Sequence, residues 1–252
     1  MFHLEVIPAP GESARLPQQE ARHLSASRRL REGDAVDLFD ARGTVAHAAV
    51  LACARNGPVR VQILERHRSA PEALRLHLAS AVAKGERQSV LLDMATQLGM
   101  SAYTPLLCER SAMRPSPAAT RRWQRIVLEA CKQSRRLYAP TLHPPADPST
   151  VAQHAVAAGD TVWMADPAAA VFNPRAVPAA AARATLMIGP EGGFTDAERD
   201  ALTAAGAMPV GLGETILRIE LAAVTALNVY RLAALPPAAA AAARASGDSP
   251  SR

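Results

Sequence analysis

The spacing of hydrophobic and polar positions changes once along the chain, near residue 70. Before this point, short apolar runs alternate with turn signals such as Glu32-Gly-Asp34 and Asn56-Gly-Pro58. This length and spacing predict several short strands, which together form a small barrel or sandwich. The strands are expected over residues 4–7, 35–39, 44–51 and 59–64, with one short helix over 18–30.

Beyond residue 70, short apolar runs alternate with longer segments of helical period. Strands are expected over 74–81, 102–107, 161–165, 184–188 and 208–212, and helices over 89–98, 120–137 and 219–235. This alternation predicts an α/β domain whose mostly parallel sheet is covered on both faces. We therefore assign residues 1–70 to a first domain and residues 71–235 to a second. The tail over 236–252 is rich in Pro and Ala and is expected to be disordered.

Composition narrows the class of protein. The 252 residues are 49% hydrophobic, which suffices for a sizeable core. No apolar run reaches the roughly 18 residues that a membrane span needs, and the first residues lack the basic region of a signal peptide. The three cysteines have no paired spacing, which argues against a disulfide framework or a zinc site. We expect a cytoplasmic protein that uses no membrane and no metal.

Positive charge is concentrated in the middle of the chain. The net charge is +2 over residues 1–70, +5 over 71–150 and −2 over 151–252. At about 100° per residue, the helix over 120–137 carries its cations on one face and its apolar residues on the opposite face. Such a face either follows RNA phosphates or is an ordinary solvated surface. The cations on it are Arg121, Arg125, Lys132, Arg135 and Arg136, and a second cluster contains Arg22, Arg28 and Arg29.

Two glycine-containing loops are the strongest candidates for a ligand site. An apolar strand runs into Gly189-Pro-Glu-Gly-Gly193, and a second turn at Leu212-Gly213 precedes the last helix. Glycines without a Cβ let backbone groups approach a ligand closely. Neither loop has the pattern of a dinucleotide fingerprint or a P-loop. The loops therefore predict a pocket for a small, mostly neutral, planar ligand, with a capping box at Thr195-Asp-Ala-Glu198 opening the next helix.

Taken together, the two loops resemble those of a known family. Ile188-Gly-Pro-Glu-Gly-Gly-Phe-Thr195 and Leu212-Gly-Glu-Thr-Ile-Leu-Arg-Ile-Glu220 are similar to the cofactor loops of the bacterial small-subunit ribosomal RNA uridine-N3 methyltransferases, which belong to the SPOUT class. Further matches are Lys84-Gly-Glu-Arg87, Ala95-Thr-Gln-Leu-Gly99 and Glu109-Arg-Ser111. The resemblance covers about residues 1 to 235.

The resemblance implies a fold, a cofactor and partners. The fold would be a SPOUT-type α/β domain with a C-terminal trefoil knot, preceded by a small PUA-like β-barrel that binds RNA. The cofactor would be S-adenosylmethionine (SAM), held by the knot loops. The partners would be small-subunit (16S) ribosomal RNA, naked or within the assembled subunit, and a second copy of the chain in a homodimer. The reaction would be methylation of N3 of a specific uridine.

The resemblance also assigns roles to residues. The cofactor would be bound by Ile188, Gly189, Pro190, Glu191, Gly192, Gly193, Leu212, Gly213, Ile216, Leu217 and Arg218. Catalysis would use Arg136 and Arg218 on the RNA phosphate or the uracil oxygens, and Glu220 to orient Arg218 or to accept a proton. RNA would be bound by Arg22, Arg28, Arg29, Arg121, Arg125 and Lys132.

Among the departures from the family's pattern, three bear on whether the chain is an active enzyme. Met94 and Gln97 stand where the family has a lysine and a glutamate, and Leu221 stands where it has a threonine. Two alternatives therefore remain, a non-catalytic RNA-binding relative and a SPOUT methyltransferase with another RNA target. The two intact glycine loops favour an active methyltransferase, because a protein that transfers nothing would not need them.

Overall fold

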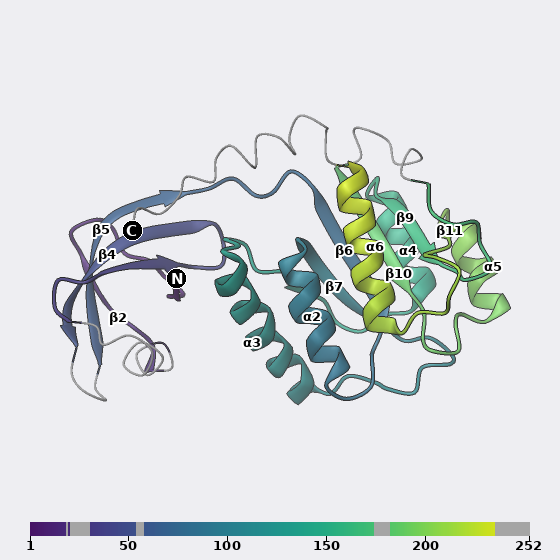
Figure 1. Cartoon of the computed structure of the whole chain (residues 1–252), viewed down its shortest axis with the longest axis horizontal. Helices are drawn as coiled ribbons and strands as arrows, with labels where there is room; N and C mark the ends of the chain where they lie inside the picture. The colour runs from purple at the N-terminus through teal and green to yellow at the C-terminus, as the bar shows by residue number, and fades with distance from the viewer. Residues whose placement is uncertain (19, 21–30, 54–57, 174–181, 235–252) are drawn as a thin grey trace. The chain divides into compact units, whose positions relative to one another are not determined.

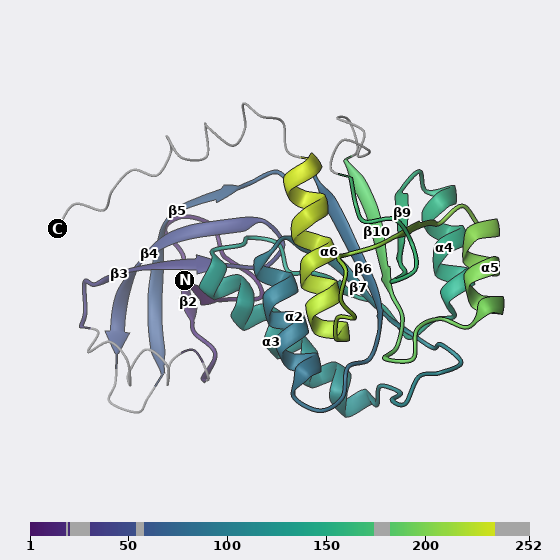
Figure 2. The ribbon, with the colours of Figure 1, turned by 45° about the vertical axis from the view of Figure 1, so that its right-hand side comes forward.

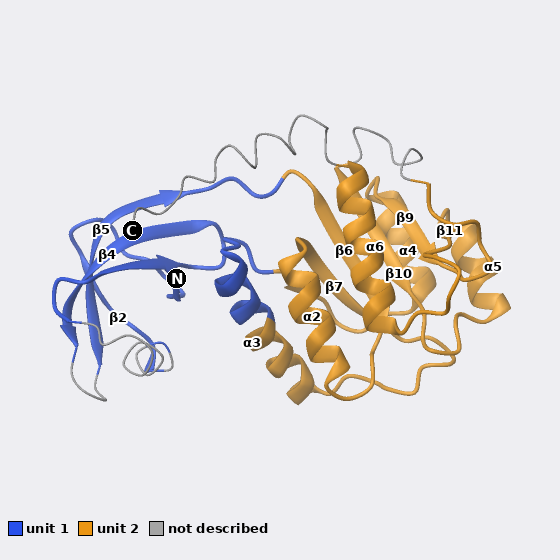
Figure 3. Ribbon diagram, in the orientation of Figure 1, with its two compact units in different colours: residues 1–72, 127–139 blue, residues 73–126, 140–252 orange. Residues whose placement is uncertain are grey.

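The computed structural model describes residues 1–18, 20, 31–53, 58–173 and 182–234. Several predictions fall outside these residues. They are the helix over 18–30, of which only residues 18 and 20 are described, the cations Arg22, Arg28 and Arg29, and the tail over 236–252. The chain divides into two compact units, Met1–Glu72 with Val127–Ala139, and Ala73–Ile126 with Pro140–Arg252 (Figure 3). The domain boundaries drawn from the sequence, at residues 70 and 235, stay a prediction.

The first unit is built on a five-stranded sheet with the order β1-β3-β4-β5-β2. The strands are β1 Phe2–His3, β2 Ser13–Arg15, β3 Ala35–Phe39, β4 Thr44–Cys53 and β5 Val59–Arg68. β1 pairs with β3 in parallel, and the other pairs are antiparallel. Alternate positions of these strands, among them Leu38, Val61 and Ile63, are fully buried and form the core.

The strand predicted over residues 4–7 was wrong. Leu4 and Ile7 are buried in the core, but the chain bends between them and leaves Val6 72% exposed. The Leu4 N–H donates the last hydrogen bond to β3, to the Phe39 carbonyl at 3.0 Å. Leu4 and Ile7 therefore pack into the core from an irregular segment. A pattern of hydrophobic positions does not distinguish such a segment from a short strand.

The second unit contains a six-stranded sheet with the order β11-β9-β10-β6-β7-β8. The strands are β6 Arg75–Ala81, β7 Met100–Leu106, β8 Thr141–Leu142, β9 Thr161–Ala165, β10 Arg183–Ile188 and β11 Met208–Val210. All five pairings between them are parallel, which confirms the predicted sheet type. The central strands have continuous apolar runs, as expected where both faces are covered.

Helices cover both faces of this sheet (Figures 1 and 2). They are α2 Arg87–Gln97, α4 Pro148–Ala157, α5 Asp196–Ala204 and α6 Ile219–Ala234. α2 and α6 pack together on one face, and α4 and α5 lie on the other. The sequence analysis missed α4, although Asp147 is a clear start signal: its carboxylate accepts hydrogen bonds from the backbone of Ser149 and Thr150.

One helix, α3 Pro117–Ser134, contributes residues to both units. It ends three residues earlier than the predicted end at Leu137, because Arg135 adopts a left-handed conformation with φ 56°. The Arg136 N–H then closes the helix end on the Cys131 carbonyl at 2.9 Å. No helix among the described residues is both long and apolar enough to cross a membrane.

Candidate functional site

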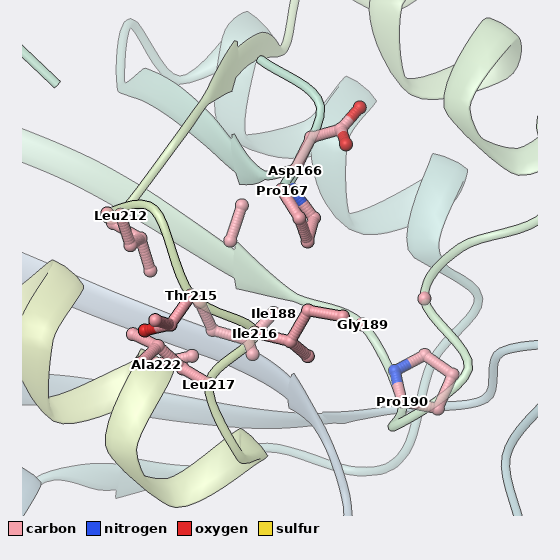
Figure 4. Close-up of a pocket in the computed structure, with 13 residues that line it drawn as sticks. Asp166, Pro167, Ile188, Gly189, Pro190, Leu212, Thr215, Ile216, Leu217 and Ala222 are labelled. Atoms are coloured by element: carbon pink, nitrogen blue, oxygen red, sulfur yellow. The ribbon is translucent and has the colours of Figure 1, made fainter. Parts of the chain in front are cut away.

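A pocket lies in the second unit, at the edge of the sheet where β9, β10 and β11 end. Three loops line it, one after each of these strands, together with the first turn of α6 (Figure 4). The pocket has a cavity volume of about 80 Å³, within about 550 Å³ of empty space that includes open solvent. In an open parallel sheet, the carboxyl ends of the strands are where ligands bind.

The loop after β10 is shaped by its glycines and by the start of α5. A Cβ on Gly189 would stand 3.1 Å from the backbone nitrogen of Phe194, and Gly193 has φ +69°. The Thr195 hydroxyl accepts the Glu198 N–H at 3.2 Å, and the Glu198 carboxylate accepts the Thr195 N–H at 2.8 Å. This confirms the predicted capping box, which fixes where the loop ends.

A neighbouring segment holds this loop from outside the pocket. Arg110 Nη1 donates to the Gly192 carbonyl at 2.8 Å, and the Glu109 N–H donates to Glu198 Oε1 at 2.8 Å. Burial, with help from Glu198, raises the pKa of the adjacent Cys108 to about 12, so this cysteine is a neutral thiol rather than a nucleophile. We name Arg110 and Glu109 the loop brace.

The loop after β11 is held by close backbone contacts with the loop after β9. The Gly211 N–H donates to the Ala170 carbonyl, and the Phe172 N–H donates to the Gly211 carbonyl, both at 2.9 Å. A Cβ on Gly211 would stand 2.5 Å from the Ala169 carbonyl oxygen. Gly211 is therefore required by close approach, and the next glycine, Gly213, by its φ of +144°.

The walls of the pocket are mainly apolar side chains and backbone. Figure 4 shows Leu212, Ile216 and Leu217 from the loop before α6, with Asp166 and Pro167 from the loop after β9. The Asp166 carboxylate accepts the Ala168 N–H at 2.9 Å and lies 4.0 Å from Arg199 Nε, so it is already engaged. Such walls suit a ligand that is largely neutral and planar, as the sequence predicted.

The structure brings most of the predicted cofactor residues together. Those that line the pocket are Ile188, Gly189, Pro190, Gly193, Leu212, Gly213, Ile216 and Leu217. Glu191, Gly192 and Arg218 belong to the same loops but do not line it, and all three are exposed. The sequence analysis missed Ala165, Asp166 and Pro167, which could have been found as the segment that follows a predicted parallel strand.

Glu220 has a different partner from the one predicted. It lies in the first turn of α6, and its Oε1 atom is 3.8 Å from Arg87 Nε, at the start of α2. The predicted role of Glu220, to orient Arg218 or to accept a proton, stays a prediction. Arg218 itself is exposed at the end of the pocket loop.

The other predicted cations lie on or after α3. In the first unit, Arg136 Nε donates to Glu72 at 2.9 Å, and Lys132 Nζ lies 2.8 Å from both Glu20 and Glu129. The side chains of Arg136 and Lys132 are 9% and 10% exposed. Carboxylates therefore offset both charges, which makes these residues poorer phosphate ligands than exposed arginines. Their predicted roles stay predictions.

Arg121 and Arg125 are exposed on α3, in the part of the helix that belongs to the second unit. Arg122, between them, forms an ion pair with Glu86. Free guanidinium groups on one helix are suited to phosphate contacts. The exposure of Arg121 and Arg125 agrees with their predicted RNA-binding role, which stays a prediction.

The departures from the family pattern lie on the surface rather than in the pocket. Met94 and Leu221 are 44% and 51% exposed, and Gln97 Nε2 donates to Asp93 at 2.9 Å. Ala222, the residue after Leu221, is the one that lines the pocket. Among the residues that the structure describes, no group of His, Cys, Asp and Glu is arranged to hold a metal ion.

Two family models match the chain. The model described as the RNA methyltransferase domain matches residues 70–231, and the model described as the RNA methyltransferase PUA domain matches residues 16–57. Among curated proteins, the ribosomal RNA small subunit methyltransferase E of Mycobacterium tuberculosis is 32% identical over 238 residues, covering 90% of this chain and 89% of the relative. The protein of the same name from Synechocystis is 34% identical over 222 residues, covering 84% of this chain and 70% of the relative.

Solved structures give the same result. A protein from Legionella pneumophila, solved in complex with the bound cofactor SAM, matches with a TM-score of 0.82 and 28% identity. The ribosomal RNA small subunit methyltransferase E of Neisseria gonorrhoeae, bound to SAM, matches with a TM-score of 0.80 and 28% identity. Each comparison covers 92% of this chain and 96% of the other chain.

Proposed function

Because the chain belongs to the RNA methyltransferase family of ribosomal RNA small subunit methyltransferase E, we propose that it transfers the methyl group of SAM to N3 of a uridine in small-subunit ribosomal RNA. The observation that carries this proposal is the pocket at the carboxyl edge of the parallel sheet. It is formed by the two glycine loops, and relatives with the same fold have been solved with SAM bound.

The residues of the pocket fit SAM. Apolar side chains such as Leu212 and Leu217 can cover a flat adenine ring, and the glycines leave backbone groups free to bind its polar edge. When bound, SAM supplies a methyl group on a positively charged sulfur. The acid among the described residues that line the pocket, Asp166, is already engaged by Ala168 and Arg199. We therefore expect SAM binding to depend on shape and backbone hydrogen bonds.

The chain's own contribution to the reaction is positioning and electrostatics. N3 of a uracil carries a proton, and negative charge develops on the ring as this proton is lost. A guanidinium group near the uracil oxygens would stabilise that charge, and Arg218, which is exposed beside the pocket, is our candidate for this task. Glu220, in the first turn of α6, is the candidate to accept the proton, and its Oε1 atom lies 3.8 Å from Arg87 Nε.

The C-terminal trefoil knot, the homodimer and the cytoplasmic location belong to the same proposal. The resemblance of both pocket loops to the cofactor loops of the SPOUT class supports the knot. The homodimer is supported by exposed apolar side chains on the packed pair α2 and α6, namely Val90, Met94 and Leu221. Sedimentation of the purified chain would test the dimer, since a single monomeric species at micromolar concentration would contradict it.

The proposed function is tested by methyl incorporation. The purified chain is incubated with labelled SAM and either small-subunit or large-subunit RNA, each as naked RNA and within assembled subunits. We expect label in the small-subunit RNA alone. Binding of RNA and SAM without any incorporation would instead identify a non-catalytic relative, and label in another RNA would identify a different target.

Replacing Arg110 of the loop brace by alanine should weaken SAM binding. The change removes the hydrogen bond to the Gly192 carbonyl, which involves a charged donor, and frees the loop that lines the pocket. A loss of about 1.5 kcal/mol, or roughly tenfold in affinity, is expected. Calorimetric titration with SAM measures it, and Arg114→Ala, at an exposed arginine nearby, is the matched control. Equal affinities in the two variants would show that the brace has no effect on the pocket.

Replacing Arg121 and Arg125 together by glutamine should weaken RNA binding and its salt dependence. If each arginine neutralises one phosphate, the slope of log affinity against log salt should fall by roughly 1.4 for single-stranded RNA. Fluorescence anisotropy at several salt concentrations measures the slope. The matched control is Arg122→Gln, because Glu86 already binds this arginine on the same helix. A double variant with the parent slope would remove these two arginines from the RNA-binding surface.

A further inference from the structure

A second cavity lies in the second unit beneath α4 and reaches the amino ends of β9 and β10, whereas the methyl-transfer pocket lies at the carboxyl ends of these strands. It has a volume of about 400 Å³, which is within the range of small-molecule sites. Its floor is formed by β6, β7 and β10, and α4 covers it with Thr150, Val151 and His154. Neither the catalytic residues nor the cofactor loops contribute to it.

One wall of this cavity is a directional chain of hydrogen bonds. The Thr185 hydroxyl donates to Asp160 Oδ2 at 2.8 Å, so its oxygen can accept from His77 Nδ1 at 3.3 Å. His77 Nε2 is then left to accept from the Thr104 hydroxyl at 2.8 Å. Burial, reinforced by the neighbouring His143, lowers the pKa of His77 to about 4, so the ring is neutral at physiological pH.

The single acid that lines the cavity is already satisfied. Arg183 Nε donates to Asp160 Oδ1 at 2.7 Å, while Thr185 binds the other oxygen, and the Asp160 side chain is only 8% exposed. Both nitrogens of His77 are occupied as well. The internal hydrogen bonds therefore use the acceptor groups of this wall and leave it with little capacity to bind a cation.

The groups that remain for a ligand are mostly donors. Arg183 is half exposed, and its bond to Asp160 uses Nε rather than the two terminal nitrogens. His143 and His154 are exposed at the cavity, and the His154 ring makes no hydrogen bond or ion pair with the residues that the structure describes. Pro144 and Pro145 add a flat apolar surface beside them. A guanidinium group and imidazole rings next to an apolar surface suit an anion that is attached to a flat, apolar body.

We propose that this cavity is a second ligand site, which binds a small phosphate-bearing molecule with a planar ring, of the size of a nucleoside monophosphate. The phosphate lies against Arg183 and His154, and the ring lies against the two prolines. The site is separate from the methyl-transfer pocket, and the proposal does not depend on the proposed function.

The test is a titration of the full chain with uridine 5′-monophosphate, followed by the NMR signals of the histidine rings. We expect saturable shifts of the His143 and His154 signals at submillimolar ligand, whereas His47, in the first unit, serves as an internal reference that does not move. Uridine, which lacks the phosphate, should leave the signals unchanged. An absence of saturable shifts at millimolar nucleotide, or equal shifts with uridine, would overturn the proposal.

A variant pair makes the test specific to the cavity. His154→Gln removes a group without a structural partner, so the fold should persist, and the affinity for the nucleotide should fall about tenfold. His47→Gln, the matched control, should leave the affinity unchanged, and both variants should bind SAM like the parent chain. A His154→Gln variant with the parent's nucleotide affinity would contradict the proposed site even if some binding is observed elsewhere.

Discussion

Gly211→Ala is expected to lower the affinity for SAM by about a hundredfold. The added methyl would stand 2.5 Å from the Ala169 carbonyl oxygen and 3.0 Å from that of Ala170. Both are backbone atoms, so a side-chain rotation cannot relieve the overlap, and the loop after β9 must move away from the loop after β11. Overpacking of this kind costs about 1–3 kcal/mol, and the pocket between the two loops would lose its shape.

Calorimetric titration with SAM measures this effect, and Gly192→Ala is its matched control. A Cβ at Gly192 meets only the flexible side chain of Arg110, at 3.3 Å, so the control should bind SAM within about threefold of the parent chain. A thermal melt of each variant shows whether the second unit still folds. If folded Gly211→Ala binds SAM as tightly as Gly192→Ala does, the close approach of the two loops does not shape the cofactor pocket.

Arg218→Ala is expected to slow methyl transfer by roughly a hundredfold to a thousandfold while the affinity for SAM stays nearly constant. This is the usual cost of removing a donor that stabilises charge in a transition state. Arg218 is exposed beside the pocket and does not line it, so its guanidinium is available to the uracil rather than to the cofactor. The variant should therefore separate the rate of the chemical step from cofactor binding.

Single-turnover methylation with saturating RNA measures the rate, and a SAM titration on the same sample measures the affinity. Arg218→Lys should recover part of the rate, because it restores the charge without the planar fork. Arg114→Ala, at an exposed arginine that does not line the pocket, controls for a general loss of charge. A parallel loss of SAM affinity in Arg218→Ala would make Arg218 a cofactor ligand, and an unchanged rate would exclude it from catalysis.

The sequence predicted the second unit well because its signals are local and strong. Long apolar strands that alternate with amphipathic helices leave few other arrangements, and the capping box at Thr195 marks a helix start within four residues. The two glycine loops could be identified in the same way. The short strands of the first unit have weaker signals, and residues 4–7 show that two buried apolar residues do not make a strand.

The contacts that complete the site could not be predicted, because they join residues far apart in the chain. Arg110 reaches Gly192 across 82 positions, and Lys132 reaches Glu20 across 112. Helical periodicity shows which side chains share a face of α3, but it does not show which carboxylates lie opposite them. For this reason Lys132 and Arg136 could not be distinguished in the sequence from Arg121 and Arg125, which are exposed.

Nucleoside analysis of the product shows whether the methyl group lies on N3 of uridine. Small-subunit RNA that lacks the modification is incubated with the chain and SAM, digested to nucleosides and analysed by mass spectrometry against synthetic standards. We expect 3-methyluridine, at up to one per RNA molecule, and far less from the Gly211→Ala variant when the SAM concentration just saturates the parent chain. A methyl group on the ribose, on carbon 5 of uracil or on another base would contradict it.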